Sequence, residues 1–265
     1  MSHELLIRLS VFLGLFVGFA GLEAWAPKRA RVVHRAGRWF ANLSLTILNT
    51  LALRALAVAL PFLAIGAAVD AASQGWGVFN HLQWPFWQEV LLALLILDFA
   101  IWLQHLITHK VPLFWRFHRV HHADRDMDVT TGLRFHPVEI LASMGLKIGL
   151  VYALGPQAVA VLLFEVILNA TALFNHSNLA LPRWLDAALR LVLVTPDMHR
   201  VHHSVQRAEH DSNFGFSLSV WDRIFRTYRA QPEAGHAEMV VGLQWQDEKP
   251  AQLGWSLRLP FRSNR

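Results

Sequence analysis

The chain has 265 residues, of which 54% are hydrophobic and only 16% are charged. Soluble proteins carry about 25% charged residues, so this composition favours an integral membrane protein. The sequence contains no cysteine, which excludes disulfides, thiolate zinc sites, cysteine-ligated iron–sulfur clusters and covalently attached c-type haem. The net charge is only +5 and no nucleic-acid recognition module is visible, so we expect no nucleic-acid partner.

Apolar stretches of membrane-spanning length recur along the chain. A helix that crosses a bilayer needs about 20 mostly apolar residues. Five stretches reach or approach that length, at residues 4–26, 43–69, 86–104, 137–154 and 156–175. The first stretch lacks a small-residue cleavage site and is followed by basic residues, so we interpret it as an anchor rather than a signal peptide. The sequence therefore predicts an all-α integral membrane protein with four to five transmembrane or re-entrant helices and a cytoplasmic helical cap.

The last two stretches are separated by a single glycine. Pro137 and Pro156 each stand where proline suits the first turn of a helix, and Gly155 stands where glycine suits a helix end. We expect a helical hairpin that either crosses the membrane fully or enters it partway.

The loop between the first two stretches predicts the orientation. It carries five cations and no acid to offset them: Lys28, Arg29, Arg31, Arg35 and Arg38. The positive-inside rule places this loop in the cytoplasm, and counting spans then brings every histidine cluster to the same side. We expect a multi-pass protein of the bacterial inner membrane, with its histidine site facing the cytoplasm.

Three regions are expected along the chain. Residues 1–85 would form N-terminal membrane anchor helices, residues 86–230 a histidine-box catalytic domain, and residues 231–265 a cytoplasmic tail. The tail shows no strong periodicity, so no function is assigned to it.

The histidines carry the chemistry. His105 and His109 are spaced HxxxH, the sequence HRVHH occurs twice, and one further histidine ends the fifth apolar stretch. Residues three and four positions apart share a helix face, so each box can direct its imidazoles to one place. Pro112 and the run Thr195-Pro196-Asp197 are typical of helix starts, which supports helices for the two HRVHH boxes.

The number of histidines indicates how many metal ions they hold. A metal takes four to six ligands, so nine converging imidazoles are too many for one ion and suit two. Imidazole binds iron, zinc, copper and nickel, so the ligand type alone does not name the metal. The Glu-x-x-His pairs of carboxylate-bridged di-iron proteins are missing, which favours a histidine-rich dimetal site.

The motifs resemble those of the fatty acid hydroxylase superfamily, which includes sterol desaturases, sterol methyl oxidases and fatty acid 2-hydroxylases. The resemblance covers roughly residues 86–230 and is closest to bacterial proteins labelled sterol desaturases. It rests on six segments, HLITH (105–109), FHRVHH (117–122), RFHPVE (134–139), NHSN (175–178), MHRVHH (198–203) and NFGFSLSVWDRIFRTYR (213–229).

This resemblance implies two iron ions, with O2 as co-substrate, held by His105, His109, His118, His121, His122, His176, His199, His202 and His203. Fatty acid 2-hydroxylases have a further histidine where this chain has Ala180, so one ligand is absent relative to that branch. His136 precedes a proline, and the sequence leaves it open as a ligand, a supporting group, a lid contact or a helix cap.

Other polar residues fall within the apolar stretches. Lys147 and Glu165 lie about equally far from the hairpin tip, which predicts an ion pair, although a snorkelling lysine or a protonated glutamate is an alternative. Asp98 shares a helix face with His105 and is predicted either to orient a histidine or to pair with Arg54. Asn169 and Asn175 are candidates for polar contacts near the site.

These features predict a membrane-bound oxygenase that hydroxylates a C–H bond of a lipid-like substrate drawn from the bilayer. A desaturase on the same scaffold is the alternative enzyme, and a membrane metal- or haem-handling protein is the alternative of another class.

A zinc hydrolase would need a glutamate inside a box, where both HRVHH boxes have arginine. No GxGxxG fingerprint is present, so we expect electrons from a separate ferredoxin- or cytochrome-type donor with its reductase. Zinc can take the place of iron in purified protein.

Overall fold

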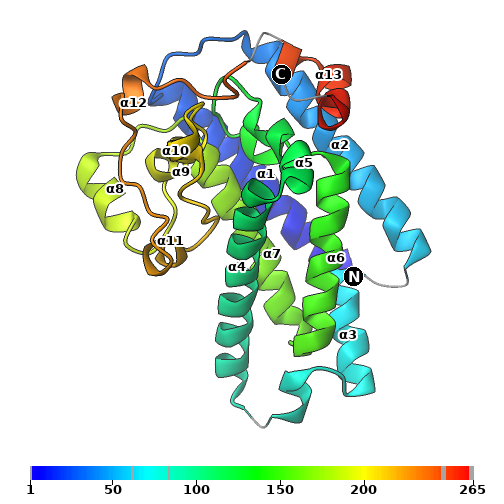
Figure 1. Ribbon diagram of the computed structural model, residues 1–265. Coiled ribbons are helices and arrows are strands. Elements are labelled where there is room, and N and C mark those ends of the chain that lie inside the picture. Colours follow the sequence, from blue (N-terminus) through cyan, green and yellow to red (C-terminus); the bar gives the residue numbers. More distant parts are fainter. Residues whose placement is uncertain (1, 61–62, 83, 246–248, 263–265) are drawn as a thin grey trace.

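The computed structural model describes residues 2–60, 63–82, 84–245 and 249–262. In this part of the chain every regular element is a helix (Figure 1). Five segments are long and apolar enough to cross a membrane: Leu6–Trp25, Arg35–His81, Phe86–Lys110, Pro137–Leu154 and Ala158–His176. The predicted all-α membrane fold is confirmed.

The long helices form a bundle together with the shorter α3, and the other short α-helices lie toward the opposite end from α3 as a cap (Figure 1). The bundle consists of α1 (Ser2–Trp25), α2 (Arg35–Ala59), α3 (Ala64–Gln74), α4 (Phe86–Lys110), α6 (Pro137–Leu154) and α7 (Ala158–His176). Helix α7 packs against α1, α3 and α4, and α6 packs against α2, α3 and α4. The cap holds α5 (Pro112–His122), α8 (Arg183–Leu189), α9 (Pro196–His202), α10 (Arg207–His210), α11 (Val220–Ile224), α12 (Gly235–Glu238) and α13 (Leu253–Arg258).

The second predicted span, 43–69, is interrupted. Helix α2 ends at Ala59 and α3 begins at Ala64, while residues 61–62 lie outside the described residues. Leu60 is extended, with φ −112° and ψ 134°, and it precedes Pro61 in the sequence. Proline disfavours the helical conformation of the residue before it, which explains the end of α2.

The hairpin of α6 and α7 forms as predicted, with one difference. Pro137 occupies the first turn of α6, and Gly155 ends that helix at φ +66°, a left-handed conformation that suits glycine. Pro156, however, lies outside the fifth helix, which begins at Ala158 after an extended Gln157. The backbone N–H of Gln157 donates to Glu89 Oε1 at 3.0 Å, so the connection is held against the start of α4.

An ion pair joins the two arms of the hairpin, which confirms the sequence prediction. Lys147 Nζ lies 2.9 Å from Glu165 Oε1, and Glu165 is 4% exposed. Arg8 of α1 also pairs with the Glu165 carboxylate. Buried charges in a membrane protein normally find partners, and here one carboxylate holds three helices together.

Replacing Glu165 with glutamine should therefore destabilise the protein more than replacing Lys147 with methionine. The first change leaves two cations without this carboxylate at a cost of roughly 3–5 kcal/mol, whereas the second leaves Glu165 paired with Arg8. The midpoint of thermal unfolding in detergent measures both. Equal losses would contradict the three-way arrangement.

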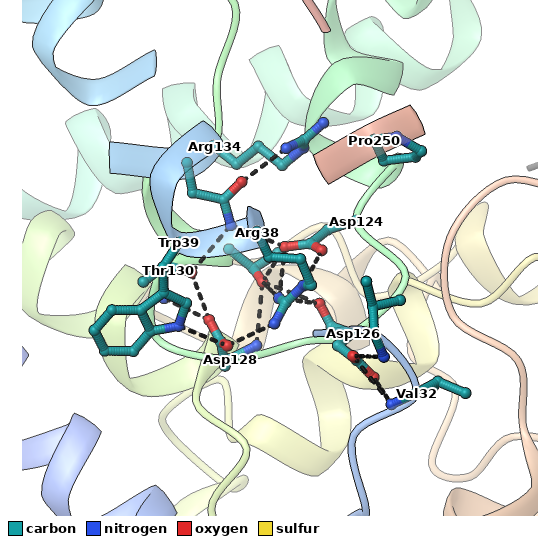
Figure 2. A network of polar contacts seen from close by, with 12 residues as sticks. Val32, Arg38, Trp39, Asp124, Asp126, Asp128, Thr130, Arg134 and Pro250 are labelled. Atoms are coloured by element: carbon teal, nitrogen blue, oxygen red, sulfur yellow. Dashed lines mark hydrogen bonds and ion pairs between the residues drawn. The ribbon is translucent and has the colours of Figure 1, made fainter. Parts of the chain in front are cut away.

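A buried network fastens α2 to the loop that follows α5 (Figure 2). Arg38 Nε donates to Asp124 Oδ1 at 2.6 Å, and Arg38 Nη1 donates to Asp128 Oδ2 at 2.7 Å. Burial alone would raise the pKa of Asp124, but the Arg38 guanidinium lowers it to about 2, so the pair is ionised at neutral pH. The network fixes the loop that leads from the second histidine box to Arg134.

The C-terminal region packs on the same loop. Trp255 and Leu259 are buried in a cluster with Leu45 of α2 and Val120 of α5. Arg134 Nη2 donates to Ser256 Oγ at 2.7 Å. Helix α13 and Leu259 thus cover the cap end of α2 and α5. The division into three regions remains a prediction.

Candidate metal centre

Four helices bring the nine predicted histidines to the cap end of the bundle. His105 and His109 end α4, and His176 is the last residue of α7. The HRVHH boxes lie at the ends of α5 and α9. Pro112 opens α5 as predicted, and Thr195 caps α9 by accepting from the N–H of Met198 at 3.4 Å.

The nine imidazoles divide into two buried groups. Within each group the ligand atoms lie within 4.8 Å of one another. The five-histidine group consists of His105, His109, His118, His122 and His202, and the four-histidine group of His121, His176, His199 and His203.

Each HRVHH box contributes to both groups. In α5, His118 and His122 are one helical turn apart and enter the five-histidine group, while His121 enters the other. In the box of α9 the assignment is the opposite: its first and last histidines, His199 and His203, enter the four-histidine group, and His202 enters the five-histidine group. The rings of His122 and His203 stack between the groups, with centroids 4.6 Å apart. Because each copy of the motif supplies histidines to both groups, the two groups lie side by side in one centre.

Hydrogen bonds from outside the groups orient many of the rings. His105 Nδ1 lies 2.7 Å from the carbonyl oxygen of Phe214. The same distance separates His176 Nδ1 from the carbonyl oxygen of Ala172, and His202 Nδ1 from that of Ser212. His118 Nδ1 lies 2.6 Å from Glu139 Oε1, and His121 Nδ1 lies 3.2 Å from the Arg134 carbonyl. Because carbonyl and carboxylate oxygens only accept, each of these Nδ1 atoms carries the proton, and each Nε2 presents a lone pair.

These lone pairs face one another at the centre of each group. His105 Nε2 lies 3.0 Å from His118 Nε2, and His176 Nε2 lies 3.1 Å from His121 Nε2. A close contact between two acceptors in a buried place is unfavourable unless a cation lies between them. Both ring nitrogens of His109, His122 and His203 are also buried without a hydrogen-bond partner. The donor set therefore fits a metal ion in each group.

The environment also keeps the imidazoles in the form that binds metal. Burial lowers the pKa of His121, His122, His199, His202 and His203 well below the usual value, and neighbouring histidines lower it further. Neutral imidazole is the ligand form, so no deprotonation is needed near neutral pH.

A cavity of about 310 Å³ leads from the centre into the bundle. His105 and His118 lie at one end of it, and Lys147 and Glu165 also line it. Most of the remaining lining comes from α2, α4, α6 and α7, where polar side chains such as Asn49 and Gln104 lie among apolar ones such as Leu53 and Ile101. By area, the surface of the cavity is mostly apolar. The cavity gives the five-histidine group an apolar access route within the bundle.

Gly132 lets the loop after α5 approach this end of α7. A Cβ on Gly132 would lie 2.7 Å from the carbonyl oxygen of Ala172 and 3.2 Å from His176 Nδ1. A side chain there would displace the carbonyl that orients His176, so glycine is required by close approach rather than by its dihedral angles.

The sequence model of the fatty acid hydroxylase family matches residues 90–227, the part of the chain that supplies all nine histidines. The chain belongs to this family. It is 27% identical over 233 residues to an ornithine lipid hydroxylase of Rhizobium tropici, an alignment that covers 87% of this chain and 70% of the relative.

Other relatives share a smaller part of their length. The chain is 30% identical over 175 residues to a human alkylglycerol monooxygenase, covering 64% of this chain and 36% of the relative. It is 28% identical over 147 residues to a cholesterol 25-hydroxylase of Rattus norvegicus, covering 55% and 48% respectively. The chain thus spans about a third to a half of these two relatives. No solved structure matches it significantly.

Three predictions about neighbouring polar residues are settled by the geometry. His136 belongs to neither histidine group and caps α6, because its Nδ1 accepts from the N–H of Val138 at 3.2 Å. Asp98 instead accepts from Trp221 Nε1 at 2.8 Å, so both predictions for its partner were wrong. Asn175 Nδ2 donates to the carbonyl of Phe216 at 2.7 Å, next to the centre, and Asn169 lines the cavity.

Sequence reasoning missed two carboxylates that support the centre. Asp222 accepts from the backbone N–H groups of Phe214 and Gly215, each at 2.9 Å, and from Trp102 Nε1 at 3.0 Å. It therefore holds the loop whose Phe214 carbonyl orients His105. The other is Glu139. Both acids lie inside segments quoted above, RFHPVE and NFGFSLSVWDRIFRTYR, which were the available signals.

Replacing Glu139 with glutamine should weaken metal binding by about 10- to 100-fold without unfolding the protein. The amide cannot match the charge-assisted hydrogen bond to His118, and losses of this size are typical when the partner of a metal-bound histidine is removed. Competition with a chelator measures the affinity. Asp98→Asn is the control, since Asp98 bonds a tryptophan instead, and equal losses in both variants would contradict the assignment.

Proposed function

We propose that this protein is a membrane-bound di-iron oxygenase that uses O2 and external electrons to hydroxylate a C–H bond of a lipid-like substrate. The single observation that carries the proposal is the pair of buried histidine groups, in which the unprotonated Nε2 atoms of His105 and His118 lie 3.0 Å apart and those of His121 and His176 lie 3.1 Å apart. The apolar cavity that reaches His105 and His118 supports a lipid as the substrate.

The names of the relatives support the same class of reaction. They are hydroxylases and monooxygenases, and the molecules in their names are an ornithine lipid, an alkylglycerol and cholesterol. These share a hydrocarbon portion that suits entry from a bilayer. We extend the reaction type to this chain, and the particular lipid stays open.

In this proposal one iron is held by His105, His109, His118, His122 and His202, and the other by His121, His176, His199 and His203. The irons would supply the activation of O2 for attack on an unactivated C–H bond. The chain's own residues bind and position: the cavity aligns the hydrocarbon beside His105, and the surrounding helices keep all nine histidines buried.

We also propose that a separate ferredoxin- or cytochrome-type donor supplies the electrons, and that the centre faces the cytoplasm of a bacterial cell. Burial of all nine ligands at one end of the bundle supports an oxygenase over a metal or haem transporter. A transporter needs histidines spaced along a pore through the spans.

The test is lipid mass spectrometry of a bacterial host that expresses the full chain, supplied with isotopically labelled O2. A lipid that gains one labelled oxygen atom supports hydroxylation. A lipid that loses two hydrogens without gaining oxygen supports the desaturase instead. The double variant His121→Ala/His202→Ala is the control, and oxidised lipid that persists in it would refute the proposed site.

A further inference from the structure

A second cavity of about 340 Å³ reaches the same centre from the cap. We call it the cap pocket; it is lined by Lys110, Trp115, Arg119, Arg207, His210 and Trp245, with His109 at its inner end. It shares no lining residue with the cavity inside the bundle. The five-histidine group therefore has two separate approaches, one at His105 and His118 and the other at His109.

The two approaches differ in chemistry. Among the described residues of the cap pocket, three are cations and Asp211 is the one acid. Arg207 and Lys110, whose side chains are 81% and 49% exposed, both pair with Asp211 at the opening, at 3.9 and 2.8 Å. The two cations outnumber the one acid, so the opening keeps a net positive charge. A hydrocarbon has no charge to interact with such a surface, whereas a partner protein with an acidic face is attracted to it electrostatically.

Aromatic rings connect the opening to the histidines. The ring of His210 stacks on Trp115, with centroids 5.4 Å apart and planes inclined by 12°. The ring of Trp115 in turn lies 4.9 Å from the ring of His109 and 5.3 Å from that of His122. A single indole thus spans the distance between the pocket wall and two proposed ligands of the five-histidine group.

We propose that the cap pocket is the docking site of an acidic one-electron carrier protein of the ferredoxin class, and that Trp115 lies on the route of the electrons. This inference rests on the proposed function. In each encounter the carrier loses one electron and the metal centre gains one. The arrangement separates the reductant from the lipid, because each reaches the centre from its own cavity.

The test measures ferredoxin binding and electron transfer rather than lipid hydroxylation. The probe is an acidic [2Fe–2S] ferredoxin, reduced beforehand and mixed without O2 with the iron-loaded full chain in detergent. Its oxidation is followed by absorbance at several salt concentrations, and binding of oxidised ferredoxin is titrated separately. Arg207→Glu should slow oxidation and weaken binding roughly tenfold at low ionic strength, and the difference should shrink as salt screens the charges.

Two further variants separate the steps. Arg183→Glu makes the same charge change at an exposed position of α8 that does not line the pocket, and it should behave like the unaltered protein. Trp115→Leu should slow oxidation of the ferredoxin by a larger factor than it weakens binding, in protein shown to keep its iron.

Equal behaviour of Arg207→Glu and Arg183→Glu, or no oxidation of ferredoxin by the unaltered protein, would overturn the docking site. Neither result would affect the proposed function if the protein holds iron and oxidises lipid with a chemical reductant. Loss of that lipid oxidation would instead count against the proposed function itself.

Discussion

Alanine at His118 and alanine at His121, three residues apart in one box, are expected to deplete different metal ions. His118 belongs to the five-histidine group and His121 to the four-histidine group, so each single variant should keep about one iron per chain. The double variant should keep none. Lipid oxidation should fall more than about a hundredfold in each single variant, since even the partners of metal-bound histidines contribute 10- to 100-fold.

His136→Ala is the matched control for this pair. His136 is buried in the same region but belongs to neither group, and its Nδ1 only caps α6. Its loss should cost about 1 kcal/mol of stability, as for other helix caps, and leave both irons in place. Iron content by elemental analysis separates the outcomes. If His118→Ala and His121→Ala each left both irons in place, the division into two groups would be refuted.

Arg38→Ala should cause a large loss of stability, similar to that expected for Glu165→Gln. Arg38 is 2% exposed, and its removal leaves the Asp124 and Asp128 carboxylates buried without their cation. Breaking a buried ion pair in this way costs roughly 3–5 kcal/mol. The loop from Asp124 to Arg134 would also lose its fixed position, so we expect weaker metal binding as a second effect.

Thermal unfolding in detergent at a fixed heating rate, which compares variants without assuming reversibility, measures this effect. Arg31→Ala removes the same charge at an exposed position of the same region and should leave the midpoint close to that of the unaltered protein. Arg38→Lys should recover only part of the loss, because an ammonium cannot reproduce the forked contacts to Asp124. Equal midpoints for Arg38→Ala and Arg31→Ala would contradict the role of this network.

Local patterns were sufficient to predict most of the fold. Apolar length located the long helices, because a bilayer imposes a nearly fixed span on any sequence that crosses it. Pro137, Gly155 and Thr195 marked helix ends through their own backbone chemistry and short-range hydrogen bonds. The break before Pro61 was missed because the apolar run continues through it, and hydropathy does not register a change of backbone direction.

The site was predicted as a set of residues but not as an arrangement. Spacing placed His118 and His122 on one face, and nothing in the box showed that His202 joins them while His199 joins His121. That division depends on the relative placement of α4, α5, α7 and α9, which is decided by contacts between residues far apart in sequence. For the same reason Asp222, which accepts from the backbone N–H of Phe214 and thereby supports His105, left no periodic signal.

The measurement that tests the central claim most directly is the metal content of the full chain. The protein would be purified rapidly in detergent, without chelator or a metal-affinity step, from cells grown with ample iron. We predict about two irons per chain, because nine imidazoles provide four to five ligands for each of two ions. Freshly prepared protein without stoichiometric metal would contradict the account of the two histidine groups.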